Sequence, residues 1–85
     1  AIALAPRQPV YLLEKASLNV RVARYTEALP ILAVLINAFP DDMDCNRLLG
    51  FCYIQLGDKQ RGIPYLEKAA TMGDNNAATL LERYK

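Results

Sequence analysis

Residues 46–66 read NRLLGFCYIQLGDKQRGIPYL, in which small residues stand at fixed points of two apolar runs. Gly57 and Asp58 separate the runs, since a glycine readily ends a helix and an aspartate caps the start of the next one. Gly50 and Gly62 stand inside the runs and remove side-chain bulk from each of them. We therefore expect two antiparallel helices whose axes approach closely where these two glycines meet.

The same arrangement recurs 34 residues earlier in the chain. Ala16 precedes Gly50 by this interval, and Ala28 precedes Gly62 by the same interval. Further pairs at this offset are Pro6 and Pro40, Asn19 and Tyr53, Pro30 and Pro64, and Leu32 and Leu66. A fixed period of this length is typical of helical repeats, in which each unit buries its apolar face against the next one.

This pattern resembles the tetratricopeptide repeat, whose signature is W-x2-L-G-x2-Y, then A-x3-F, then P. The second copy reads Asn46-x2-Leu49-Gly50-x2-Tyr53, followed by Gly62-x3-Leu66. The first copy reads Leu12-x2-Lys15-Ala16-x2-Asn19, followed by Ala28-x3-Leu32 and a closing Pro40. The chain has no Trp, and Lys15, Asn19 and Asp74 replace the Leu, Tyr and Pro that the family prefers. The resemblance covers residues 9–74 and is closer in the second copy.

The resemblance implies an all-α fold of antiparallel helical hairpins stacked as a short right-handed α-solenoid. The whole chain would form a single domain. Its parts would be the tail of a preceding repeat (1–6), repeat one (9–40), repeat two (41–74) and a capping helix (75–85).

Proline, glycine and aspartate mark the expected ends of the helices. Pro30 and Pro64 recur at matching places, which indicates a tolerated feature and not a break. The predicted helices span 1–4, 9–22, 25–39, 43–56, 59–72 and 77–84, and the fourth of these starts at residue 42 instead if Asp41 is its cap. The last of these is amphipathic, as a terminal helix that covers a repeat array would be. Its apolar side chains, expected to cover the last hairpin, are Ala77, Leu80, Leu81 and Tyr84, and the side chains expected to face solvent are Glu82, Arg83 and Lys85. No comparable cap precedes the first hairpin, so we expect either earlier repeats or another chain at that end.

Charge and hydropathy argue against two classes of partner. Ten basic and nine acidic side chains nearly balance, and no segment clusters Lys or Arg, which makes nucleic acid an improbable ligand. The longest uncharged run covers residues 28–40, and prolines and Asn37 interrupt it. It is shorter than the roughly 20 apolar residues that a membrane helix requires, so we expect no membrane insertion.

The sequence offers little material for catalysis, and we expect neither an enzyme nor a cofactor or metal site. It contains no histidine, which excludes Ser-His and Cys-His nucleophilic pairs. Cys45 and Cys52 are seven residues apart in a predicted helix, about 10 Å along its axis, and cannot form a disulfide with each other. Unpaired thiols favour a reducing compartment such as the cytoplasm without identifying it. Asp41, Asp42 and Asp44 are interpreted as helix-capping residues, because an EF-hand glycine and glutamate are missing from this segment.

In an array of such hairpins the first helix of each pair lines a concave groove that binds extended peptides or a partner helix. Arg21 and Arg47 could bind a carboxylate or a carbonyl there. Phe51 and Ile54 could instead pack against the neighbouring repeat. The groove residues predicted on this basis are Val10, Leu13, Ser17, Val20, Arg21, Asp44, Arg47, Phe51, Ile54 and Gln55.

The leading functional hypothesis is a scaffold for protein-protein interaction, with a protein or peptide as its partner, within the C-terminal part of a longer repeat protein. One alternative is a small dedicated chaperone of a secretion-type system, which would store an aggregation-prone substrate. Another is an assembly module that self-associates through the first helix. The Lys and Asn clamp with which some family members bind chaperone tails is missing, because Leu13, Ser17, Arg47 and Phe51 occupy its places.

Overall fold

The computed structural model describes residues 8–85, and this part of the chain is entirely helical, with no strand. The helices are α1 (Gln8–Arg21), α2 (Tyr25–Ala38), α3 (Met43–Gln55), α4 (Lys59–Thr71) and α5 (Asn75–Tyr84). The predicted helix over residues 1–4 lies outside the described residues. The other predictions agree with the structure to within one residue at each end, except that α5 begins two residues earlier than expected.

Aspartate side chains determine where three of the helices begin. Asp42 accepts a hydrogen bond from the Cys45 amide at 3.0 Å, and Asp58 accepts one from the Arg61 amide at 3.1 Å. Asp74 accepts from two amides of the first turn of α5, which explains why that helix begins at residue 75. Each cap satisfies amide groups that have no partner within the helix.

Three turns between helices use a residue in the left-handed backbone region. Gly57 has φ 90° and Gly73 has φ 105°, and glycine adopts such values without steric strain. Ala23 stands 34 positions before Gly57 and has φ 63°, although it carries a β-carbon. The turn between α1 and α2 therefore repeats the geometry of the turn between α3 and α4 with a less suitable residue.

Both internal prolines lie within continuous helices. Pro30 is in α2 and Pro64 is at the matching place in α4, and neither helix breaks there. The prediction that these prolines are tolerated is confirmed.

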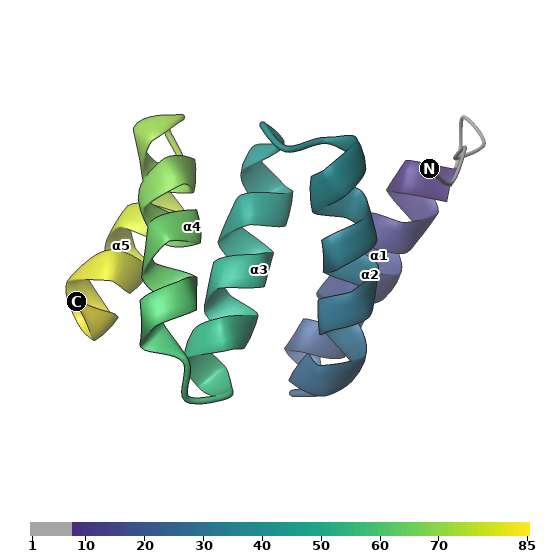
Figure 1. The fold of residues 1–85 in the computed structure, drawn as a ribbon, viewed down its shortest axis with the longest axis horizontal. Helices are drawn as coiled ribbons and strands as arrows, with labels where there is room; N and C mark the ends of the chain where they lie inside the picture. The colour runs from purple at the N-terminus through teal and green to yellow at the C-terminus, as the bar shows by residue number, and fades with distance from the viewer. Residues whose placement is uncertain (1–7) are drawn as a thin grey trace.

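The helices form hairpin-like pairs arranged along the longest dimension of the molecule (Figure 1). Helices α1 and α2 lie at one end, α4 and α5 lie at the other end, and α3 lies between them. Helix α3 contacts all four other helices, so it is the central element of the fold. The molecule measures 36 × 25 × 19 Å along its principal axes.

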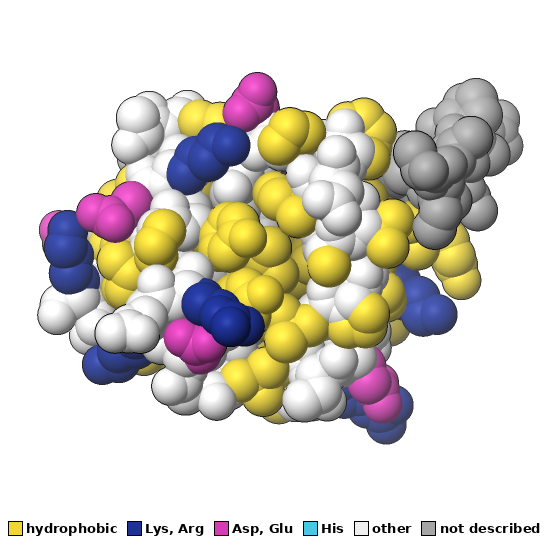
Figure 2. Space-filling view, viewed as in Figure 1, with side chains coloured by type: hydrophobic (Ala, Val, Ile, Leu, Met, Phe, Trp, Pro, Cys, Tyr) yellow, Lys and Arg dark blue, Asp and Glu magenta, His cyan; other side chains and the backbone are white. Residues whose placement is uncertain are grey.

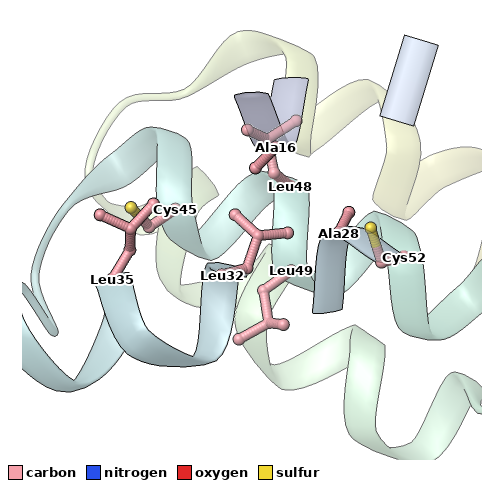
Figure 3. Close-up of a cluster of buried hydrophobic side chains, with 8 residues drawn as sticks. All are labelled: Ala16, Ala28, Leu32, Leu35, Cys45, Leu48, Leu49 and Cys52. Carbon is pink, nitrogen blue, oxygen red and sulfur yellow. The ribbon is translucent and has the colours of Figure 1, made fainter. Parts of the chain in front are cut away.

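Two clusters of buried side chains hold the helices together. The larger one joins α1, α2 and α3 and consists of Ala16, Ala28, Leu32, Leu35, Cys45, Leu48, Leu49 and Cys52 (Figure 3). The smaller one joins α3, α4 and α5 and consists of Ile54, Leu66, Ala69 and Ala77. Figure 2 shows hydrophobic side chains over the middle of the molecule, where α3 lies between α2 and α4.

Small residues are buried in both helix pairs, and in the second pair they stand where the helices cross, as the sequence predicts. Ala16 and Ala28 are completely buried in the first pair. In the second pair, a β-carbon added to Gly50 would lie 2.8 Å from the Gly62 carbonyl oxygen, and one added to Gly62 would lie 2.6 Å from the Gly50 carbonyl oxygen. The two backbones therefore touch directly at this crossing.

Candidate binding groove between α3 and α5

A surface hollow of about 360 Å³ lies between α3 and α5. Its lining residues are Arg47, Leu48 and Phe51 from α3, and Asn76, Thr79, Leu80 and Arg83 from α5. The residues from α5 follow the three- and four-residue spacing that places side chains on one face of a helix. The floor is apolar, and two guanidinium groups and two small polar side chains surround it. We refer to this hollow as the α3/α5 groove.

Polar contacts tie the two helices together at both ends of the groove. The Arg47 guanidinium donates to Asp74 at 2.8 Å and to Asp44 at 3.0 Å. Gln55 Nε2 donates to the Tyr84 hydroxyl at 2.9 Å. The beginning of α3 thus contacts the beginning of α5, and the end of α3 contacts the end of α5. The two helices therefore run in the same direction, with the groove between these contacts.

The ion pair between Arg47 and Asp74 is the most buried one in residues 8–85. The Asp74 side chain is 3% exposed, and the Arg47 side chain is 23% exposed. Asp74 also caps α5, so its carboxylate accepts from two backbone amides and from the guanidinium. These contacts fix both the start of α5 and the position of Arg47 at the groove.

Phe51 lies between the groove and the first hairpin. Its ring meets the Tyr25 ring edge-on, with centroids 5.8 Å apart and an interplanar angle of 75°. This arrangement is favourable for aromatic rings and restricts the rotation of both side chains. Phe51 therefore packs against the neighbouring helix pair and lines the groove at the same time.

The structure brings some of the predicted groove residues together and separates others. Arg47 and Phe51 line the α3/α5 groove, Asp44 pairs with Arg47, and Gln55 contacts α5. Ile54 is only 7% exposed and belongs to the smaller core cluster, so its side chain cannot form an accessible groove floor. Its cluster partners Leu66, Ala69 and Ala77 belong to α4 and α5, so Ile54 packs within its own hairpin and against α5.

The predicted residues of the first helix lie elsewhere. Leu13, Ser17 and Arg21 border a separate hollow of about 400 Å³ along α1. Leu13 and Val20 also pack in part against the larger core cluster. Val10 is 61% exposed and borders a smaller hollow of about 160 Å³ near the loop between α2 and α3.

The contribution of α5 was missed by the sequence prediction. Leu80 was assigned to the face that covers the last hairpin, and Arg83 was assigned to the solvent side. Both line the groove, together with Asn76 and Thr79. The spacing of these four residues along a single helix was the available signal.

Both cysteines are free, as predicted, and both are buried. Burial raises the pKa of the Cys45 thiol from 9.0 to about 12, and the nearby Asp42 and Asp44 carboxylates add to this increase. Burial alone raises the pKa of the Cys52 thiol to about 11. Both thiols are therefore protonated at neutral pH and poor nucleophiles.

Two further properties concern the described part of the chain only. No helix in residues 8–85 combines the length and the apolar character needed to cross a membrane. Across the same residues, no three His, Cys, Asp or Glu side chains form a group suited to a metal ion.

Comparison with known proteins gave no relative. No family model, no curated protein and no solved structure matches this chain.

Proposed function

We propose that this chain is a tetratricopeptide-like scaffold, a short right-handed stack of helical hairpins, that binds a peptide or a partner helix in the α3/α5 groove. Three features support the repeat assignment: the 34-residue interval, the small residues buried in both helix pairs, and the parallel course of α3 and α5. A parallel course is expected for equivalent helices of successive repeats.

The observation that carries the binding proposal is the apolar floor of the groove between charged donors. Leu48, Phe51 and Leu80 offer a surface on which an apolar side chain can be buried. Two guanidinium groups, those of Arg47 and Arg83, also line the groove. A ligand that places an apolar side chain next to a carboxylate or a free carbonyl complements both parts.

Arg47 retains donors for a ligand although it is already paired. Both of its ion pairs use Nη1, and a guanidinium carries five N–H groups. Arg83 is exposed and has no ion-pair partner within residues 8–85. We expect Arg47 to orient the ligand from a fixed position and Arg83 to close over it.

A peptide library displayed on phage and selected against the immobilised chain tests this proposal. Binding of each selected peptide is then measured by isothermal titration calorimetry with the wild type, Phe51→Ala and Arg83→Glu. Removing a central aromatic contact typically weakens binding by at least about tenfold, so Phe51→Ala is expected to do so. The matched control is Phe39→Ala, because Phe39 is 42% exposed but lies outside the α3/α5 groove. Equal losses for Phe51→Ala and Phe39→Ala would contradict the proposal.

A further inference from the structure

Helix α1 and the residue after it carry an unusual share of the exposed apolar surface. Tyr11 is 59% exposed, and Leu18 and Val22 are each 55% exposed. Outside residues 8–22, the exposed large hydrophobic residues of the described chain are single residues near helix ends, with exposures of 37–43%: Phe39, Met43, Leu56 and Met72. Scattered residues of that kind are normal on a protein surface, whereas a group on one helix requires an explanation.

These residues form one stripe along the helix. Tyr11, Lys15, Leu18 and Val22 follow each other at intervals of four, three and four, which is the spacing of a coiled-coil seam. The helical hydrogen-bond pattern extends to the end of the stripe, because the Val22 amide donates to the Leu18 carbonyl at 3.1 Å. Ala16 is fully buried and lies on the opposite side of α1, so the stripe faces away from the core.

Two opposite charges flank the stripe on the same side. Glu14 and Arg21 are seven residues apart, at equivalent positions of the seven-residue repeat, and both are exposed. Neither forms an ion pair with any residue between 8 and 85. In an antiparallel pair of such helices these flanking positions meet each other, so Glu14 of one copy faces Arg21 of the other, and the reverse.

The apolar residues fit the same antiparallel register. Tyr11 lies opposite Val22 of the second copy, and Lys15 lies opposite Leu18, along which its methylene chain can pack while the ammonium group remains in water. A parallel register would instead place Lys15 against Lys15 and leave both flanking charges without a partner. The charge pattern therefore selects the antiparallel arrangement.

We propose that α1 pairs with α1 of a second copy of this chain, in antiparallel register, to form a two-fold symmetric dimer. The symmetry closes the assembly at two copies, because each α1 stripe is used once. The α3/α5 groove lies toward the other end of the molecule from α1 (Figure 1), so both grooves of the dimer remain accessible. The dimer would present two binding sites to a partner that carries repeated motifs.

The first test measures the molar mass of the chain by sedimentation equilibrium up to about 1 mM, because a seam of two short helices is a small interface. We expect the wild type to dimerise and Leu18→Glu to stay monomeric. Leu56→Glu is the matched control, since Leu56 is 43% exposed and lies outside α1, and this variant should dimerise as the wild type does. Circular dichroism verifies that each variant is folded. A monomeric wild type, or a dimer that persists in Leu18→Glu, would overturn the proposal.

The second test uses charge reversal to examine the register. Glu14→Arg and Arg21→Glu each place like charges opposite each other in the homodimer, and each should weaken dimerisation by about tenfold. Equimolar mixing of the two variants restores both attractive pairs, so native mass spectrometry should show the mixed dimer in excess over either homodimer. The double variant Glu14→Arg/Arg21→Glu should also dimerise as the wild type does. A statistical mixture of the three dimers would show that these charges do not meet and would overturn the antiparallel register.

Discussion

Replacing either glycine at the crossing of α3 and α4 with alanine should destabilise the protein, although alanine is the better helix former. The added β-carbon at position 50 would lie 2.8 Å from the Gly62 carbonyl oxygen and 2.9 Å from Leu66 Cγ. At position 62 it would lie 2.6 Å from the Gly50 carbonyl oxygen and 2.7 Å from Ile54 Cγ1. Ordinary contacts begin at 3.4 Å, so the helices must separate by several tenths of an ångström.

The expected magnitude follows from two opposing effects. Overpacking of a core costs about 1–3 kcal/mol of folding free energy, and a clash with backbone atoms belongs at the upper end of that range. The change from glycine to alanine within a helix contributes about 1 kcal/mol in the opposite direction. We therefore expect Gly50→Ala and Gly62→Ala each to lower the free energy of unfolding by about 1–2 kcal/mol, or the Tm by about 5–15 °C.

Urea unfolding followed by circular dichroism at 222 nm measures these differences. Ala33→Gly, at an exposed position within α2, calibrates the propensity contribution in the same protein. Once one alanine has separated the helices, the second costs less, so the double variant should lose less than the sum of the single losses, by at least about 0.5 kcal/mol. Single alanine variants that are as stable as the wild type, or more stable, would refute the close backbone contact.

Three further predictions concern single features of the fold. Arg47→Met leaves the buried Asp74 carboxylate without its cation and should lower the free energy of unfolding by about 3 kcal/mol. Asp74→Asn should lower it by less, because an asparagine at this position can still cap α5. Equal losses of the two variants in urea unfolding would contradict this ordering. Ala23→Gly relieves the left-handed backbone at φ 63° and should raise the free energy of unfolding by up to about 1 kcal/mol, and a lower thermal midpoint would count against it. Burial raises the pKa of the Cys52 thiol from 9.0 to about 11, so its contribution to stability is complete below pH 9 and is lost as the pH rises toward 11. Between pH 8 and pH 10.5, the free energy of unfolding of the wild type should therefore fall relative to that of Cys52→Val by up to about 2 kcal/mol. Parallel pH profiles of the two proteins would disprove this.

Local signals explain why the helices could be predicted from the sequence. Asp42, Asp58 and Gly57 act on the residues next to them, so the ends of α3 and the start of α4 follow from short segments. The pairing of Gly50 with Gly62 was also predictable, because the 34-residue interval repeats the small residues of the first hairpin.

Contacts between distant residues could not be predicted in this way. Arg47 and Asp74 are 27 residues apart, and their ion pair depends on how α5 packs against α3. Asn46 is 1% exposed and donates to the carbonyls of Pro40 and Asp42, which fixes the loop between α2 and α3. Neither role has a local signature. The sequence around Arg47 would look the same if its side chain stayed in solvent, and the sequence around Asn46 would look the same if Asn46 made neither hydrogen bond.

The lining of the α3/α5 groove could be predicted for α3 but not for α5. Phe51 and Arg47 were predicted because they lie on one face of α3, but Leu80 and Arg83 were assigned to other roles. Their place in the groove depends on the rotation of α5 about its own axis. The contacts of Asp74 and Tyr84 determine that rotation, and both depend on tertiary structure.

The most direct measurement of the binding proposal is a chemical-shift map of the ¹⁵N-labelled chain titrated with a peptide obtained by library selection. Our account predicts that the largest amide shifts occur in α3 around Arg47 and Phe51 and in α5 from Asn76 to Arg83, with small shifts in α2. Shifts concentrated on α2, or on the outer face of α4, with the α3/α5 groove unperturbed, would contradict it.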